Sequence, residues 1–135
     1  MFGKTHSKPQ TQIDSLIGAN ATIGGDLNFS GGLRIDGQVN GNVIATPGKP
    51  STLVLSEHAR VNGEVSVTHL VINGTINGSV SASEYLELQG KAKVTGDIHY
   101  KTMQIQLGAI IEGRLIHGKP EADDKVVAFK AGSGE

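Results

Sequence analysis

Glycine recurs along this chain at nearly constant spacing, and each of these glycines stands two residues before an apolar residue. The intervals between them are 16, 22, 15, 18 and 17 residues, and the longest interval contains the loop-like sequence 46–51. Six units of about sixteen residues therefore repeat, and a fixed period of this size is typical of a solenoid. The six glycines are Gly25, Gly41, Gly63, Gly78, Gly96 and Gly113.

Apolar and polar residues alternate within each unit, which is the period of a strand. Residues 71–80 contain the sequence Ile-Asn-Gly twice, four residues apart. The three residues between Gly74 and Gly78 are too few for the two arms of a hairpin. The two turns are therefore predicted to be consecutive corners of one coil, with Ile72, Ile76 and Val80 pointing inward. Glycine at such corners is expected to supply a positive φ.

The predicted fold is an all-β, single-domain parallel β-helix of about six rungs, whose turns bury their apolar side chains against one another. At about 4.8 Å per rung, the rod is about 29 Å long. The β-helix domain is expected at 15–117. A disordered N-terminal tail is expected at 1–14 and a disordered C-terminal tail at 118–135.

The units have two lengths: long units such as 55–65 and 88–98, and short units at 35–43 and 72–80 that have two residues fewer. The six Gly-x-apolar units, the alternation of long and short units, and the flanking polar tails together resemble the bactofilins, a family of bacterial polymer-forming cytoskeletal proteins. This resemblance implies a right-handed coil and filaments that assemble end to end without nucleotide. It also implies a scaffold that organises cell shape or cell-wall machinery. The implied partners are other copies of the chain, the inner face of the cytoplasmic membrane, and cell-wall enzymes or other client proteins. The implied location is the cytoplasm, at the membrane, as cytoskeletal filaments.

The first eight residues allow two interpretations. The start Met1-Phe2-Gly3-Lys4 is similar to the membrane-targeting start of the same family, which assigns membrane binding to Met1, Phe2, Lys4 and Lys8. The other interpretation is a disordered start with an ordinary initiator methionine.

The terminal rungs are the predicted polymerisation interface, because the edge of a sheet presents unpaired N–H and C=O groups. Capping by the apolar segment 126–129 is the alternative at the C-terminal end. The residues assigned to the interface are Ile17, Ile23, Leu27, Met103, Ile105, Ile111 and Leu115.

Charge and composition argue against several other function classes. The chain has 12 basic and 13 acidic residues, so it lacks the basic excess of a nucleic-acid-binding protein. It has no cysteine, and none of its five histidines has a partner at metal-ligand spacing.

The sequence of residues 113–119 is similar to the phosphate-loop motif G-x4-G-K, but Pro120 replaces the required hydroxyl and no helix is predicted after it. We therefore predict neither cofactor nor catalytic residue.

Two alternatives come from other functional classes. The first is a left-handed β-helix acyltransferase with hexapeptide repeats. That fold needs 18 residues per turn, and spacings of 15, 16 and 17 residues would move the apolar residues of successive turns out of alignment. The second is a carbohydrate-binding β-helix with an aromatic groove. The chain has only two Tyr, three Phe and no Trp from which to build such a groove.

Overall fold

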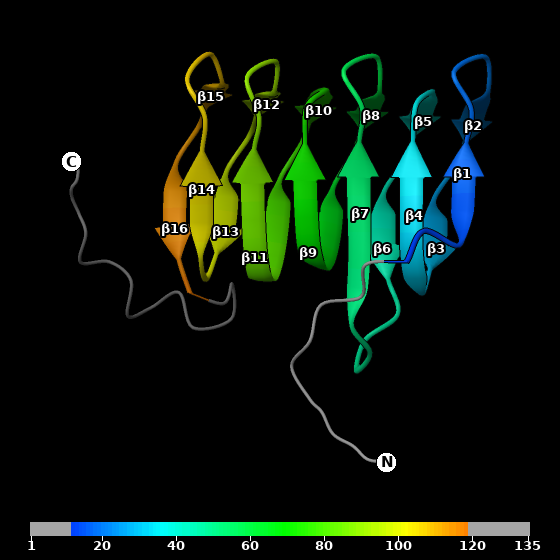
Figure 1. Cartoon of the computed structure of the whole chain (residues 1–135), viewed down its shortest axis with the longest axis horizontal. Coiled ribbons are helices and arrows are strands. Elements are labelled where there is room, and N and C mark those ends of the chain that lie inside the picture. Colours follow the sequence, from blue (N-terminus) through cyan, green and yellow to red (C-terminus); the bar gives the residue numbers. More distant parts are fainter. Residues whose placement is uncertain (1–11, 119–135) are drawn as a thin grey trace.

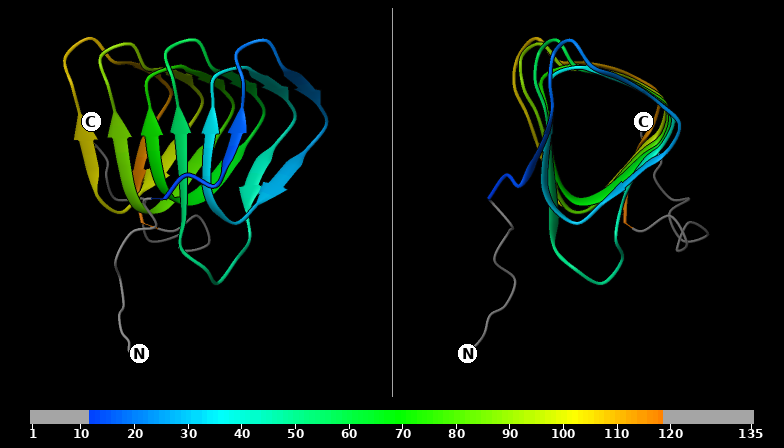
Figure 2. Two further views of the ribbon diagram at one scale, coloured as in Figure 1. Left: turned by 45° about the vertical axis from the view of Figure 1, so that its right-hand side comes forward. Right: turned by 90° about the vertical axis from the view of Figure 1, so that its right-hand side faces the viewer.

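The computed structural model describes residues 12–118, which form sixteen β-strands and no helix. The strands wind into six turns, here called rungs, around a triangular interior (Figure 1; Figure 2, right). Seen from the N-terminal end, the chain turns clockwise as it recedes, so the coil is right-handed. This confirms the predicted parallel β-helix of six rungs, and the left-handed alternative is wrong. The segments 1–11, 119–125 and 130–135, and the apolar segment 126–129, lie outside the described part.

Each rung contributes one strand, or one part of a longer strand, to each face of the triangle. The first face contains β1 (Ser15–Ile17), β4 (Gly31–Ile35), β7 (Ser51–Leu55), β14 (Met103–Ile105) and the second parts of β9 (Val65–Ile72) and β11 (Val80–Leu88). The second face contains β2 (Thr22–Gly24), β5 (Gln38–Asn40), β8 (Arg60–Asn62), β10 (Thr75–Asn77), β12 (Lys93–Thr95) and β15 (Ile110–Glu112). The third face contains β3 (Leu27–Phe29), β6 (Val43–Ala45), β13 (Ile98–Tyr100), β16 (Leu115–His117) and the first parts of β9 and β11.

All strand pairs of the described part are parallel, and equivalent residues of successive rungs lie directly beside one another. The first and third faces form one ten-stranded sheet, because β9 and β11 run through the corner between them. At that corner the segment 46–50 protrudes between β6 and β7 as a loop, and the predicted loop 46–51 is one residue too long because Ser51 begins β7. Ser51, just after this loop, is buried, and its hydroxyl accepts a hydrogen bond from the backbone N–H of Thr68 at 3.1 Å.

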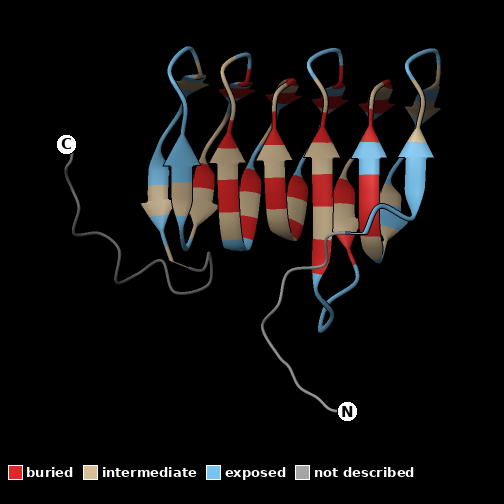
Figure 3. Cartoon of the chain, viewed as in Figure 1, coloured by how far each residue is buried: buried red, intermediate tan, exposed pale blue. Residues whose placement is uncertain are grey.

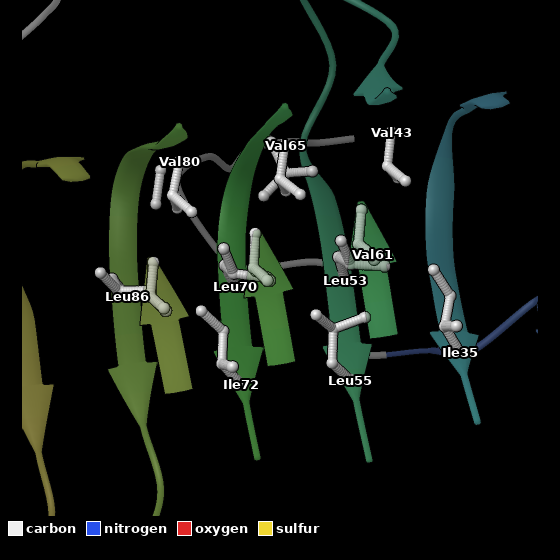
Figure 4. Packing of buried hydrophobic residues seen from close by; sticks show 14 of the residues in the cluster. Ile35, Val43, Leu53, Leu55, Val61, Val65, Leu70, Ile72, Val80 and Leu86 are labelled. Atoms are coloured by element: carbon white, nitrogen blue, oxygen red, sulfur yellow. The ribbon is translucent and has the colours of Figure 1, made fainter. Parts of the chain in front are cut away.

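The core is a set of columns of apolar side chains that run along the rod. Ile72, Ile76 and Val80 of the doubled motif have no exposed surface, which confirms their predicted inward direction. Figure 4 shows how residues of successive rungs, such as Leu53 and Leu70, stack in the interior. Burial is greatest in the middle rungs and falls at both ends of the rod (Figure 3). The core therefore ends abruptly, without a covering layer among the described residues.

The corner between the first and second faces has two forms, which correspond to the long and short units of the sequence. The short corners, at 36–37 and 73–74, connect the faces directly, and the long corners add two residues and project further (Figure 1). A short corner fits inside the long corner of the preceding rung. A Cβ at Gly74 would lie 2.6 Å from the carbonyl oxygen of Ala59 and would collide with that of Ser56.

The predicted role of the corner glycines is only partly correct. Gly37 and Gly74 are not among the glycines with positive φ, so they are required by close approach between rungs and not by backbone conformation. The glycines at the corner between the second and third faces combine a close approach with positive φ in most rungs. A Cβ on Gly41, Gly63, Gly78, Gly96 or Gly113 would collide with the carbonyl oxygen of the glycine one rung earlier.

We expect Gly74→Ala to lower the free energy of unfolding by about 3 kcal/mol, because the added methyl group meets rigid backbone and would push two rungs apart. Its Cβ would lie 2.6 Å from the carbonyl oxygen of Ala59, and its φ is not positive, so the cost comes from close approach. Urea unfolding followed by circular dichroism measures the change. Gly24→Ala is the matched control, because no atom lies within 4 Å of the Cβ position there, and it is expected to leave the urea midpoint nearly unchanged. Equal midpoints for both variants would contradict the close-approach explanation.

Candidate self-association surfaces at the two ends of the rod

The N-terminal end of the rod exposes part of the apolar core. Ile17, Ile23 and Leu27 lie at inward positions of the first rung and are half-buried, as is Phe29. Their counterparts in the second rung, Ile35, Val39 and Val43, have no exposed surface. The difference arises because each first-rung side chain has a neighbouring rung on one side only.

Residues 12–14 do not cover this end, because they turn back over the second rung. The backbone N–H of Asp14 donates to the carbonyl oxygen of Gly32 at 2.9 Å, and the Asp14 carboxylate accepts the N–H of Gly32 at 3.1 Å. The carbonyl oxygen of Gln12 lies so close to the Cα of Gly32 that a Cβ would collide with it. This packing buries Gly32 on the outer side of β4. The segment therefore leaves the rod along its first face and not across its end.

The C-terminal end exposes a second apolar layer. Met103 and Ile111 are half-buried, while the side chains of Ile105 and Leu115 are 47% and 43% exposed. One rung earlier, the equivalent positions are Leu86, Leu88, Val94 and Ile98, all with no exposed surface. Four inward side chains thus lose half of their packing at this end.

Both end rungs also present main-chain groups. Strands β1, β2 and β3 pair with the second rung only, and β14, β15 and β16 pair with the fifth rung only. A parallel edge strand offers alternating donors and acceptors that another strand can bind. Each end of the described part therefore combines an apolar centre with a rim of hydrogen-bonding groups, which is the composition of a protein–protein contact.

The last rung is held to the fifth by an ion pair as well as by the sheets. The guanidinium of Arg114 lies 2.8 Å from the carboxylate of Asp97. Hydrogen bonds from the Arg114 side chain and from its backbone N–H lower the pKa of Asp97 below its usual range. The carboxylate therefore stays charged at neutral pH, and the pair contributes to the docking of the last rung until the pH falls through this lowered pKa.

Residues 15–116 match the bactofilin family, described as polymer-forming cytoskeletal. The chain belongs to the bactofilin family. The match includes all six rungs and both apolar end layers.

Two bactofilins of Myxococcus xanthus (strain DK1622) are similar to the chain. Bactofilin BacP is 27% identical over 108 residues, which are 80% of this chain and 43% of BacP. Bactofilin BacO is 26% identical over 102 residues, which are 76% of this chain and 78% of BacO. The chain thus spans less than half the length of BacP.

A solved structure has the same fold. It is a cryo-EM reconstruction of Thermus thermophilus bactofilin double helical filaments, with a TM-score of 0.67 and 25% sequence identity. The match covers 77% of this chain and 99% of the Thermus chain. Membership in a polymer-forming cytoskeletal family indicates a structural role for this bactofilin.

The structure places every residue of the predicted interface in one of the two end layers, three at the N-terminal end and four at the C-terminal end. That they form a contact between subunits stays a prediction. The predicted membrane-binding residues Met1, Phe2, Lys4 and Lys8 lie outside the described residues.

Sequence reasoning missed Phe29 in the first rung and the exposed apolar residues Leu16, Leu107 and Ile110. Phe29 follows Leu27 at the two-residue spacing of a strand, so the alternation of apolar residues could have identified it as an inward residue. The other three can be recognised as unusual apolar residues on the outer surface only when equivalent positions of successive rungs are compared.

The histidines of the described part are dispersed over the surface. His58 is exposed and lies 3.4 Å from the carboxylate of Glu57. His69 contacts the hydroxyl of Thr68 at 3.0 Å, and the ring of His117 packs against Tyr100 with 5.4 Å between centroids. No three metal-ligating side chains come together within 12–118. The residues that approach a phosphate loop, 113–118, form a turn and strand β16.

Proposed function

We propose that this bactofilin assembles end to end into filaments without nucleotide, and that these filaments lie on the inner face of the cytoplasmic membrane as a scaffold. The observation that carries the proposal is the pair of uncovered apolar layers, one at each end of the described rod. A rod with adhesive surfaces at both ends extends without limit, because every added subunit presents another such surface.

The membrane part of the proposal rests on the start of the chain and on the path of residues 12–14. Phe2 can bury its ring in a bilayer, while Lys4 and Lys8 are attracted to anionic head groups. Residues 12–14 lie on the first face, so residue 12, which follows the segment 1–11 in the sequence, is at the side of the rod and not across its end. Membrane binding and end-to-end assembly can therefore occur in the same subunit.

Such a geometry supports the proposed scaffold role. A filament on the membrane concentrates any client that binds its repeated outer faces, and cell-wall enzymes are the class of client we propose. The Thermus protein forms double helical filaments, and 25% identity to that chain supports the same kind of assembly here.

Negative-stain microscopy of the purified full chain tests the assembly. Filaments are expected in buffer that contains neither nucleotide nor divalent metal, and added nucleotide should change neither their number nor their length. A monodisperse monomer at high concentration in analytical ultracentrifugation would contradict the proposal.

A further inference from the structure

Every exposed large apolar side chain of the described part lies in the first rung, directly before it, or in the last rung. They are Ile13, Leu16, Ile105, Leu107, Ile110 and Leu115. Ile105 and Leu115 belong to the end layer already described. Leu107 and Ile110 do not, because they lie on the outer side of the last rung, next to that layer.

Ile110 occupies an outward position of the second face that is polar in all five other rungs. Its side chain is 50% exposed. Along the sheet, β15 pairs with β12 so that Ile110 lies beside Lys93, and the same column continues through Thr75 and Arg60. The two remaining members of the column are Gln38 and Thr22.

Leu107 occupies the projecting corner between the first and second faces. Its side chain is 97% exposed, so it contributes almost nothing to the core. The corner is closed by a hydrogen bond from the N–H of Ala109 to the carbonyl oxygen of Gln106, and the long corner of the fifth rung has the same bond from Ala92 to Gln89. This alignment places Leu107 above Gly90. The other two long corners have Glu57 and Ala19 at this position.

The last rung therefore replaces small or polar residues with large apolar ones at two outer positions, three residues apart. A single exposed apolar side chain needs no explanation, but a contiguous apolar surface marks a contact site. Here the two side chains, called the corner patch below, lie on the outer side of the rung that carries the end layer. The long corners project outward from the triangle (Figure 2, right), so a partner that meets the end of the rod also meets this corner.

We propose that the corner patch binds a second copy of this chain, so that the joint at the C-terminal end extends over the outer side of the last rung. The inference rests on the proposed end-to-end assembly. Proximity to the end layer favours a second copy as the occupant, because the corner that carries Leu107 lies between Ile105 and Ile111 of that layer in the same rung. The corner patch also orients the joint, since it occupies one corner of the triangle only.

The double substitution Leu107→Glu with Ile110→Lys tests this contact in the full chain. It introduces the residue types that already stand at the same register positions in Glu57 and Lys93, so the fold is not strained. Pelleting over a range of protein concentrations gives the critical concentration for assembly. We expect the critical concentration to rise about tenfold or more, with the thermal unfolding midpoint unchanged.

Lys93→Ile is the matched control, because it places the same apolar side chain at the same outward position one rung away from the end. It is expected to leave the critical concentration unchanged. A critical concentration of the double variant within about twofold of wild type would overturn the inference, while filaments of the wild type would still support the proposed function.

The competing occupant is the segment 126–129 of the same chain. If that segment covered the corner patch, the double variant and a deletion of residues 126–129 would both assemble at lower concentration than wild type, and this result would also overturn the inference. Absence of wild-type filaments would refute the proposed function and the inference together.

Discussion

Leu115→Arg is expected to abolish filaments and leave the subunit folded. The side chain is 43% exposed in the last rung, so the arginine can extend its guanidinium into water when the subunit is free. In a joint between two ends it becomes a buried charge without a partner, which costs several kcal/mol. A cost of about 4 kcal/mol weakens each joint by roughly a thousandfold. Pelleting and negative-stain microscopy measure the loss of filaments, and circular dichroism reports the fold.

Two further substitutions separate assembly from folding. Ser81→Arg places the same charge at an outward position of the middle of the third face, between Ser66 and His99, and should leave filaments intact. Ile98→Arg places it one rung inward in the column of Leu115, at a position with no exposed surface, and should unfold the protein. Filaments of normal length from Leu115→Arg would show that this residue is not in the joint. If like ends meet, the variant stops at a dimer, which sedimentation velocity detects.

Phe2→Glu is expected to abolish co-sedimentation with anionic vesicles while filaments still form. Burial of one Phe contributes about 1.5–3 kcal/mol, and each Lys near an anionic surface adds about 1 kcal/mol. This sum is too small to hold a single subunit, since even a myristoyl chain binds a membrane only marginally. A filament presents many such starts along one surface, and their combined binding is far stronger than that of any single one. Deletion of residues 2–8 should have the same effect.

Membrane binding should therefore depend on the polymer as well as on the start of the chain. The Leu115→Arg protein, with residues 1–11 unchanged, is expected to bind anionic vesicles far more weakly than wild type at equal protein concentration. Equal binding of the two proteins would refute the avidity argument and leave the start of the chain as a sufficient anchor. Vesicles of neutral lipid provide the control for the lysine contribution.

The sequence allowed the fold and the end layers to be predicted because both depend on patterns that are local in the chain. The spacing of the six repeated glycines, from Gly25 to Gly113, determined the number of rungs. The alternation around Ile72, Ile76 and Val80 determined which side chains point inward. Once the units are counted, the first and last inward residues follow, which is why Ile17 and Leu115 could be assigned to the ends of the rod from the sequence alone.

The tertiary structure decided the features that depend on contacts between rungs. Position 74 requires glycine because the carbonyl oxygens of Ser56 and Ala59, in the preceding rung, leave no space for a Cβ atom. The path of residues 12–14 depends on the space above Gly32, eighteen residues further along from Asp14. Neither contact can be predicted from the residues that neighbour these positions in the sequence.

The sequence by itself thus determined the period of this bactofilin, its inward side chains and its six rungs, because a strand and a corner are specified by neighbouring residues. Only the tertiary structure decided which outward residues stand beside one another, because those residues are 15 to 22 positions apart and come together through the register of parallel strands. Leu107 and Ile110 can be recognised as exceptions to the polar outer surface only when they are compared with the residues beside them in that register. Their neighbours along the sheets are small or polar, and in the last rung they place large apolar side chains on the outer side, beside the open end of the core.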